Sequence, residues 1–207
     1  MTHSTTPTTA EEFDNIYSAN LIGLWDFLPS DPDADTGLAD GVAQDGAFYG
    51  ASAHNGELVT NGNGAFQVHG DDAPFDLEEG TIMLEFNQTC HNGSSPDTLV
   101  SRGEYDDRYT EGFLDIRVTA DGAVEVQHVS NGVEICVSTS DCFFNEGDDV
   151  QVFYSWSDDG GALKVVNTTQ GTEETVEIDA DMSMDIGDND GQSFTFAVPA
   201  STNMEQP

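Results

Sequence analysis

The stretch that decides the fold class is residues 113–138, "FLDIRVTADGAVEVQHVSNGVEICVS". Leu114, Ile116 and Val118 recur at every second position, so in an extended chain they share one face. The opposite face carries Phe113, Asp115, Arg117 and Thr119. This alternation is typical of a β-strand with one face in the core.

Turn residues separate this strand from its successors. Asp121-Gly122 and Asn131-Gly132 are pairs that favour tight hairpins, so residues 112–138 are predicted to form a three-stranded meander. Two further hairpins are expected through Asp159-Gly160-Gly161 and Gln170-Gly171.

Short apolar runs with Gly, Asp, Asn and Ser between them continue along the chain, and no helical stripe of useful length competes with them. We expect strands near 20–27, 46–50, 56–60, 64–69, 80–87, 97–102, 112–118, 123–129, 132–138, 149–156, 162–167, 173–179 and 193–198. The predicted fold class is all-β, a two-sheet antiparallel β-sandwich of the jelly-roll kind. One domain over residues 16–198 is expected, with a flexible tail at 1–15 and a tail or linker at 199–207.

The charge limits the partners. The chain has 40 acidic residues against four basic ones, a formal net charge of −36, which would repel nucleic acid and anionic lipid. With 37% hydrophobic residues it can still bury a core. Such a surface suits high salt or calcium-bearing surroundings, so we expect an extracellular, secreted or surface-associated protein. No apolar run approaches the roughly 18 residues of a membrane span, so no membrane insertion is expected.

Three cysteines leave at least one thiol unpaired. Cys136 and Cys142 could bridge a hairpin if oxidised, but three isolated thiols with Cys90 are the favoured interpretation.

Several segments, taken in order, resemble the laminin G-like branch of the concanavalin A-like lectin/glucanase superfamily. They are "LIGLWDF" (21–27), "GTIMLEF" (80–86), "TLVSRGE" (98–104), "FLDIRVTADGAVEVQH" (113–128), "DVQVFYSWSDDGGALKVVNTTQG" (149–171) and "MSMDIGDNDGQSF" (182–194). The resemblance covers roughly residues 20–196. It implies that Trp25 is structural and packs across the sandwich against Phe66, Phe86, Phe113 and Phe153.

The chain departs from this family at its end. Members commonly close with a strand resembling "GxIDEVxIY", whereas this chain reads "FTFAVPASTNMEQP". Either residues 193–198 replace that strand, or further domains of a longer parent protein follow.

Calcium is the expected cofactor, in a structural role. The loop from Asp185 through Asp188 to Asp190 offers carboxylates at short spacing with glycines between them, which suits an ion that takes about 6–8 oxygens. The resemblance implies a calcium site built from a first-strand region, an early glycine loop and a late acidic residue. Its matching candidates are Asp26, Asp40, Asp45 and Asp188. The alternative is an ordinary turn.

Two patterns suggest enzymes. Glu177, Asp179 and Asp181 would share one face of a strand, and they resemble the Glu-x-Asp-x-Glu row of family-sixteen glycoside hydrolases. Because the third residue is the shorter Asp and an edge position is expected, a solvated acidic face is favoured. "QVH" at 67–69 resembles one motif of alginate lyases, but the companion motifs are missing.

A ligand contact is expected in "SRGEYDDRYTEG", residues 101–112. Tyr105 and Tyr109 could stack on sugar rings, and Arg102 and Arg108 could donate forked hydrogen bonds. The alternative, which is favoured, is that the arginines neutralise nearby carboxylates. Trp156 at a hairpin end is a lesser candidate.

The leading hypothesis is a non-catalytic carbohydrate-recognition or adhesion module of an extracellular microbial protein, stabilised by calcium. Its partner would be a glycan or polysaccharide. One alternative is a glycoside hydrolase that uses Glu177, Asp179 and Asp181. Another is a structural module of an adhesin, appendage or virion with no small ligand.

Overall fold

The computed structural model describes residues 46–49, 52–54, 57–59, 64–70, 78–87, 96–103, 111–130, 132–183 and 191–197. Across these ranges the regular structure consists of thirteen β-strands. No helix that could cross a membrane is found among them. The prediction of an all-β chain is confirmed.

The larger of the two main sheets has seven antiparallel strands. In spatial order they are β1 (Gly46–Tyr49), β4 (Ala65–Gly70), β13 (Gly191–Phe196), β6 (Asp97–Arg102), β7 (Leu114–Val118), β8 (Val124–Ser130) and β9 (Val133–Ser138). The last strand in sequence, β13, lies inside the sheet between β4 and β6. It therefore occupies an interior position rather than an edge.

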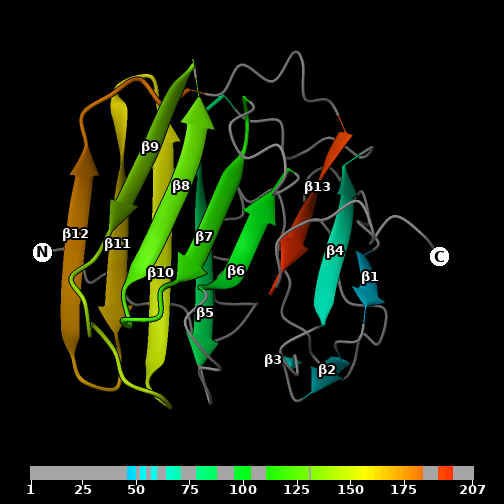
Figure 1. The fold of residues 1–207 in the computed structure, drawn as a ribbon, viewed down its shortest axis with the longest axis vertical. Helices are drawn as coiled ribbons and strands as arrows, with labels where there is room; N and C mark the ends of the chain where they lie inside the picture. The colour runs from blue at the N-terminus through cyan, green and yellow to red at the C-terminus, as the bar shows by residue number, and fades with distance from the viewer. Residues whose placement is uncertain are drawn as a thin grey trace, which may run out of the picture.

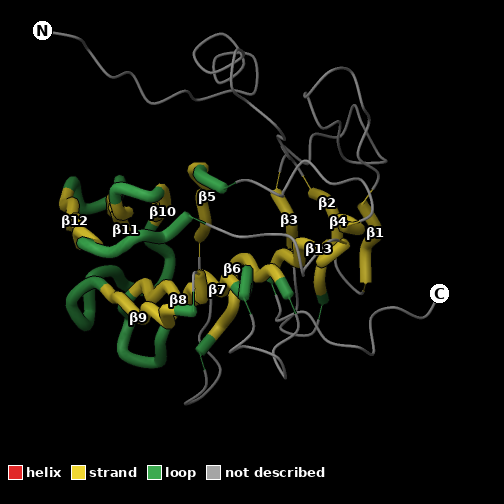
Figure 2. Tube along the Cα trace, turned by 90° about the horizontal axis from the view of Figure 1, so that it is seen from above, coloured by secondary structure: helices red, strands yellow, loops and turns green. Residues whose placement is uncertain are grey.

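The second sheet has four antiparallel strands. Their order is β12 (Thr172–Ile178), β11 (Gly160–Asn167), β10 (Asp149–Ser157) and β5 (Gly80–Asn87). It lies over β7, β8 and β9 as a separate layer, which is clearest in the view from above (Figures 1 and 2). A short hairpin, β2 (Ser52–His54) with β3 (Glu57–Val59), completes the described structure. The predicted antiparallel sandwich is confirmed.

Glycines with positive φ close the predicted hairpins. Gly122 (φ 74°) turns β7 into β8, and Gly132 (φ 70°) turns β8 into β9, which confirms the three-stranded meander. Gly171 (φ 69°) turns β11 into β12 in the same way. This left-handed conformation costs little for a residue without Cβ, so the turn residues fix the register of each pair.

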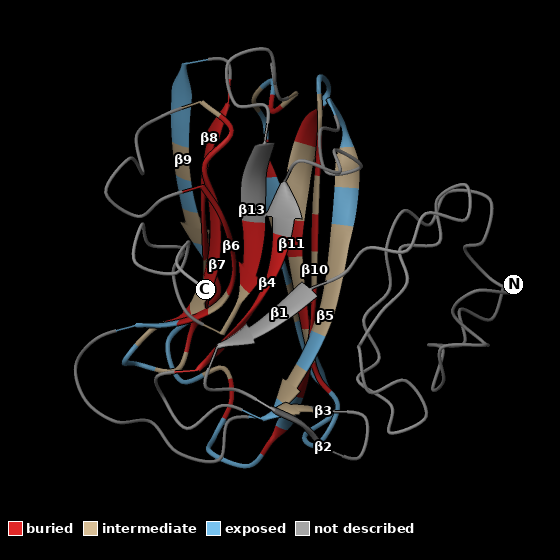
Figure 3. Cartoon of the chain, turned by 90° about the vertical axis from the view of Figure 1, so that its right-hand side faces the viewer, coloured by how far each residue is buried: buried red, intermediate tan, exposed pale blue. Residues whose placement is uncertain are grey.

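The core fills the space between the two sheets. Leu114, Ile116 and Val118 point into it, as their alternation predicts. From the other side come Val150, Val152, Tyr154, Trp156, Leu163 and Val165. A smaller core cluster is formed by side chains of β4, β13 and β6, namely Phe66, Val68, Val100 and Phe194. Buried positions therefore concentrate on the central strands, whereas β9 has only exposed and half-buried positions (Figure 3).

Two aromatic positions differ from the expected packing. Phe153 is only half-buried, because it alternates with Val152 and Tyr154, both of which face the core. Phe113 is buried but belongs to neither core cluster. Phe66 and Phe86 do pack toward the interior, whereas the predicted partner strand at 20–27 lies outside the described residues.

The remaining strand predictions match within a few residues. The exception is β2, which was not predicted, because "SAH" carries no apolar alternation. The two predicted tails, 1–15 and 199–207, lie outside the described residues.

Candidate functional site: a polar row on the outer face of the seven-stranded sheet

Five polar side chains lie next to one another on the outer face of the seven-stranded sheet, and we call them the polar row. They are Gln67 on β4, Thr195 on β13, Ser101 on β6, Asp115 on β7 and Gln127 on β8. Each is the register partner of the next. With neighbouring strands about 4.8 Å apart, the row runs about 19 Å across the strands.

Strand alternation places the row on the outer face. Its members alternate along their strands with core residues such as Phe66, Phe194 and Leu114. Successive side chains of a strand point to opposite faces, so the polar row faces away from the four-stranded sheet.

The row is polar and yet shielded from solvent. The exposed fraction is 3% for Gln67, 0% for Thr195, 1% for Ser101 and Asp115, and 6% for Gln127. Within the described part of the chain, Gln67 Oε1, Thr195 Oγ1 and Asp115 Oδ1 are buried without a hydrogen-bond partner. Most buried polar atoms are paired, because an unpaired one costs about 1–3 kcal/mol. Three such atoms make the row an unusual polar cluster, but a ligand could reach only the more exposed side chains beside it, such as Arg117, Glu125 and Glu134.

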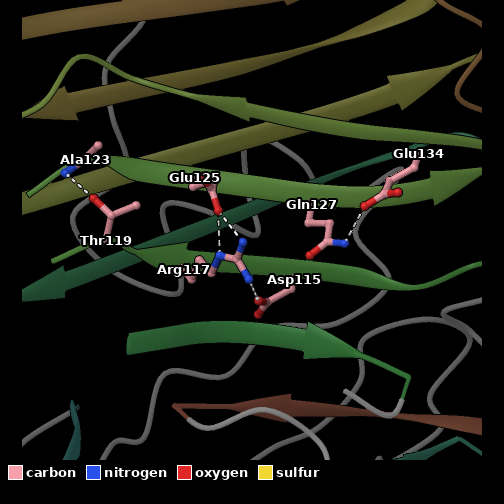
Figure 4. Close-up of polar contacts among 7 residues, drawn as sticks. All are labelled: Asp115, Arg117, Thr119, Ala123, Glu125, Gln127 and Glu134. Carbon is pink, nitrogen blue, oxygen red and sulfur yellow. Dashed lines mark hydrogen bonds and ion pairs between the residues drawn. The ribbon is translucent and has the colours of Figure 1, made fainter. Parts of the chain in front are cut away.

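An ion-pair network borders the row on β7 and β8 (Figure 4). Arg117 donates from a terminal guanidinium nitrogen to Asp115 Oδ2 at 3.2 Å, and from Nε to Glu125 Oε1 at 2.6 Å. Burial alone would lower the pKa of Arg117, but its bonds and attraction to Glu125 and Asp115 raise it above the ordinary value. Gln127 is oriented separately by donating to Glu134 Oε1 at 2.9 Å.

Asp115 has a strongly perturbed carboxyl group. Burial raises its pKa from 3.8 to about 6, although the charge of Arg117 acts in the opposite direction. At neutral pH the group is still ionised, and Arg117 bonds only one of its two oxygens, Oδ2. The other oxygen faces the shielded row as a bare acceptor.

Two predicted ligand contacts lie in the interior instead. Arg102 is 0% exposed and Trp156 4% exposed. Arg102 ends β6 opposite core residue Leu114, one position after outward-facing Ser101, and Trp156 stacks on Tyr154 with ring centroids 5.8 Å apart. Both were expected at accessible loop ends, but both still lie within strands, β6 and β10, and alternation directs them inward. Their burial argues against direct contact with a ligand.

A buried histidine accompanies these residues. His128 Nδ1 lies 2.6 Å from Tyr154 Oη, and the two rings meet edge to face. Burial, reinforced by the charge of Arg102, lowers the pKa of His128 to about 4. The ring is therefore neutral at physiological pH and serves the packing of this end of the sandwich.

The acidic row suggested for a hydrolase is not one strand face. β12 ends at Ile178, so only Glu177 lies in a strand, whereas Asp179 and Asp181 follow it. Asp181 accepts hydrogen bonds from the backbone and hydroxyl of Ser183. β12 is an edge strand, as expected.

The remaining predicted residues have mixed outcomes. Cys136 and Cys142 are exposed and unpaired, which agrees with isolated thiols. No three His, Cys, Asp or Glu side chains in the described ranges are grouped to hold a metal ion. The predicted sites that lie outside those ranges are Tyr105, Arg108 and Tyr109, with Asp26, Asp40, Asp45, Asp185, Asp188 and Asp190.

Sequence reasoning did not find the polar row, although it touched three of its members. "FLDIRVTA" placed Asp115 opposite the core face, "QVH" drew attention to Gln67, and the segment 101–112 begins with Ser101. The missing signal is burial: alternation says which face a side chain occupies and not whether that face is shielded.

Comparison with known proteins identifies solved structures that are similar to this fold. A scan of protein-family models and a search of curated proteins found no match. Among solved structures, the LG1-3 region of the laminin alpha2 chain aligns with a TM-score of 0.51 at 18% identity, over 69% of this chain and 26% of that one.

Two other similar structures align less well. The CBM40 module of the Ruminococcus gnavus IT-sialidase bound to α2,3-sialyllactose has a TM-score of 0.44 at 16% identity, over 58% of this chain and 63% of that one. The enzymatically active domain of bacteriophage CBA120 tailspike protein 2 has a TM-score of 0.44 at 12% identity, over 87% and 25%. This chain thus spans less than two thirds of each matched chain. The strand order and the laminin alignment together show that the chain has a two-sheet antiparallel β-sandwich fold similar to that of the laminin alpha2 LG1-3 region.

Proposed function

We propose that this domain is a non-catalytic carbohydrate-recognition or adhesion module, and the observation that carries the proposal is the set of accessible polar side chains on the outer face of β7, β8 and β9. Sugars present hydroxyl groups along their length, so a protein surface that binds them needs several hydrogen-bonding side chains in a line. Arg117, Glu125 and Glu134 supply such side chains, whereas the polar row beside them is shielded.

The composition supports the setting of this proposal. A net charge of −36 disfavours sulfated or uronate-rich polysaccharides, so the ligand is a neutral or cationic glycan, or an anionic one bridged by calcium. An extracellular location and a structural calcium ion bound by the Asp-rich loops belong to the same proposal.

Catalysis is not part of the proposal. The hydrolase alternative needs Glu177, Asp179 and Asp181 on one strand face, and β12 ends before the second of them. Replacing Glu177 with Gln would abolish glycan turnover if that alternative held, so turnover that survives the change excludes it.

The test is a glycan and polysaccharide binding screen, run in parallel with calcium and with chelator. Glu134→Ala is the informative variant, because it removes an exposed carboxylate from the outer face beside the polar row and leaves the core intact. It should weaken glycan binding by about tenfold, the effect of about 1.4 kcal/mol. Thr175→Val, on exposed β12 of the other sheet, should leave binding unchanged.

Either of two results would contradict the proposal. Absence of binding in both conditions would favour a structural module without a small ligand. Binding that Glu134→Ala and Thr175→Val reduce equally would place the ligand away from the outer face of β7, β8 and β9.

A further inference from the structure

We infer that the outer face of the four-stranded sheet carries a second binding surface, which takes a short basic polypeptide segment with apolar side chains. This surface, which we call the apolar patch, consists of Met83 on β5, Phe153 on β10, and Ala162 and Val166 on β11. It lies on the opposite side of the sandwich from β7, β8 and β9 (Figure 2), so the inference goes beyond the proposed function.

Strand alternation places the apolar patch on the outer face. Its members alternate along their strands with residues that pack in the core, such as Tyr154 and Leu163. Phe153 is the register partner of Met83, and the two members on β11 lie diagonally to either side of it. Diagonal neighbours of a sheet lie within reach of an aromatic side chain, so the four side chains form one apolar surface with Phe153 at its centre.

Unlike the polar row, the apolar patch is accessible. All four of its residues are half-buried, so part of each remains open to solvent. Phe153 offers the kind of aromatic anchor that is enriched at the centres of protein interfaces.

The size of the apolar patch indicates a short partner. It spans three strands, about 10 Å across them, and about 13 Å along β11. A surface of this size fits a few side chains of a partner and is much smaller than the roughly 800 Å² that each protein buries in a standard interface. The occupant is therefore a segment of chain rather than the face of a domain.

Acidic side chains border the apolar patch. Glu85 lies on the same face of β5, and Glu173 and Glu177 lie on the same face of β12. Lys164 is opposite Phe153, and it already forms an ion pair with Glu173 at 3.0 Å. The border of the patch is therefore negative.

An apolar centre with an acidic border selects a basic partner. Apolar side chains of the segment cover Phe153, and lysine or arginine on either side of them meets the glutamates, which gives the apolar core and complementary polar rim of a protein interface. The net charge of −36 steers a basic segment toward the protein. The same charge disfavours an acidic partner and a second copy of this chain.

The experiment measures binding of two short synthetic peptides. One has leucines in its middle and lysines at both ends, and in the other serines replace the leucines, so the two peptides carry the same charge. The proteins compared with the wild type are Phe153→Thr and Met83→Gln, which remove apolar surface, and a matched pair of charge variants. Of this pair, Glu177→Gln removes a carboxylate from the border of the patch, and Asp121→Asn removes one from the turn between β7 and β8.

The wild type should bind the leucine peptide about tenfold more tightly than the serine peptide, because only leucine fills the apolar centre. Phe153→Thr should remove this preference, and Met83→Gln should reduce it. Glu177→Gln should weaken binding of both peptides more than Asp121→Asn does. The two apolar variants lie at outward positions of different strands, so one of them still decides the result if urea unfolding shows the other to be unfolded.

Three results would overturn the inference. Equal binding of the two peptides, or equal effects of Glu177→Gln and Asp121→Asn, would show attraction by the net charge alone. A preference that Phe153→Thr and Met83→Gln both keep would place the apolar contact elsewhere on the protein. If neither peptide binds and Phe153→Thr reduces glycan binding, the occupant of the apolar patch is a sugar. The proposed function is tested separately, by the effect of Glu134→Ala on glycan binding.

Discussion

Replacing Asp115 with Asn should stabilise the fold near neutral pH and have little effect near pH 4. The ionised carboxylate is buried with one unsatisfied oxygen, and the ion pair with Arg117 offsets only part of that cost. An asparagine side chain has the same shape as the protonated acid and carries no charge. The substitution therefore removes the cost of ionisation without making a cavity.

The magnitude follows from the pKa. Burial raises the pKa of Asp115 from 3.8 to about 6, a difference of about 2 pH units, and each unit corresponds to about 1.4 kcal/mol. Because the folded state holds the proton more tightly, the contribution of this group is full below about pH 4. It is lost as pH rises through about 6, by about 3 kcal/mol. Loss of one carboxylate partner by Arg117 reduces the net gain of the variant to roughly 1–3 kcal/mol.

Urea unfolding followed by the fluorescence of buried Trp156 measures this at about pH 4 and about pH 7.5, in constant high salt. The difference in free energy of unfolding between variant and wild type is determined at each pH, and the two differences are then compared. The many other carboxylates contribute equally to both proteins and cancel in this comparison. Asp141→Asn, on an exposed turn, should give no such change. If Asp115→Asn has the same effect at both pH values, or destabilises the fold at both, the carboxylate is not strained and the reasoning is refuted.

Three further predictions concern the interior and the turns. Because the pKa of His128 is lowered from 6.5 to about 4, the free energy of unfolding should fall by about 3 kcal/mol as pH falls through that range. The raised pKa of Asp115 has the opposite effect on stability in the wild type, so urea titrations of Asp115→Asn should reveal the loss due to His128. Tyr154→Phe should lower the free energy of unfolding by about 1–3 kcal/mol, because it leaves His128 Nδ1 without its 2.6 Å hydrogen bond, and an unchanged urea midpoint would contradict this. Gly160→Ala should lower the free energy of unfolding by at least about 2 kcal/mol, because Gly160 has φ +124° and a Cβ there would meet a carbonyl oxygen of β12. Gly171→Ala, at φ +69° with open space around it, should lower it by about 1 kcal/mol. Equal losses in the two variants would contradict the clash.

Much of the fold could be predicted from the sequence because its signals are local. Asp121-Gly122 and the glycines at 132 and 171 specify where strands reverse, and the alternation around Leu114 specifies the core face. These features depend on neighbours within a few residues. The position of β13 between β4 and β6 depends instead on pairing across the whole chain, which no local pattern encodes.

The candidate site could not be predicted for a related reason. Gln67, Ser101, Asp115 and Thr195 are far apart in sequence and become neighbours only through strand pairing. A search for motifs looks for functional residues that are close in sequence, as in residues 101–112, and therefore misses a set with one member per strand.

Ser101 and Arg102 show how finely the result depends on register. They are consecutive, and the sequence suggested Arg102 as the ligand contact because a guanidinium can bind a sugar. In the strand, Arg102 pairs with core residue Leu114 and faces inward, whereas Ser101 pairs with Asp115 and joins the polar row. A shift of one residue would exchange the two side chains and bury Ser101 in the core. Both the face that a strand residue occupies and its exposure therefore decide its role: substitutions at the accessible outward positions of β7, β8 and β9 should change binding, whereas those at inward positions should change stability.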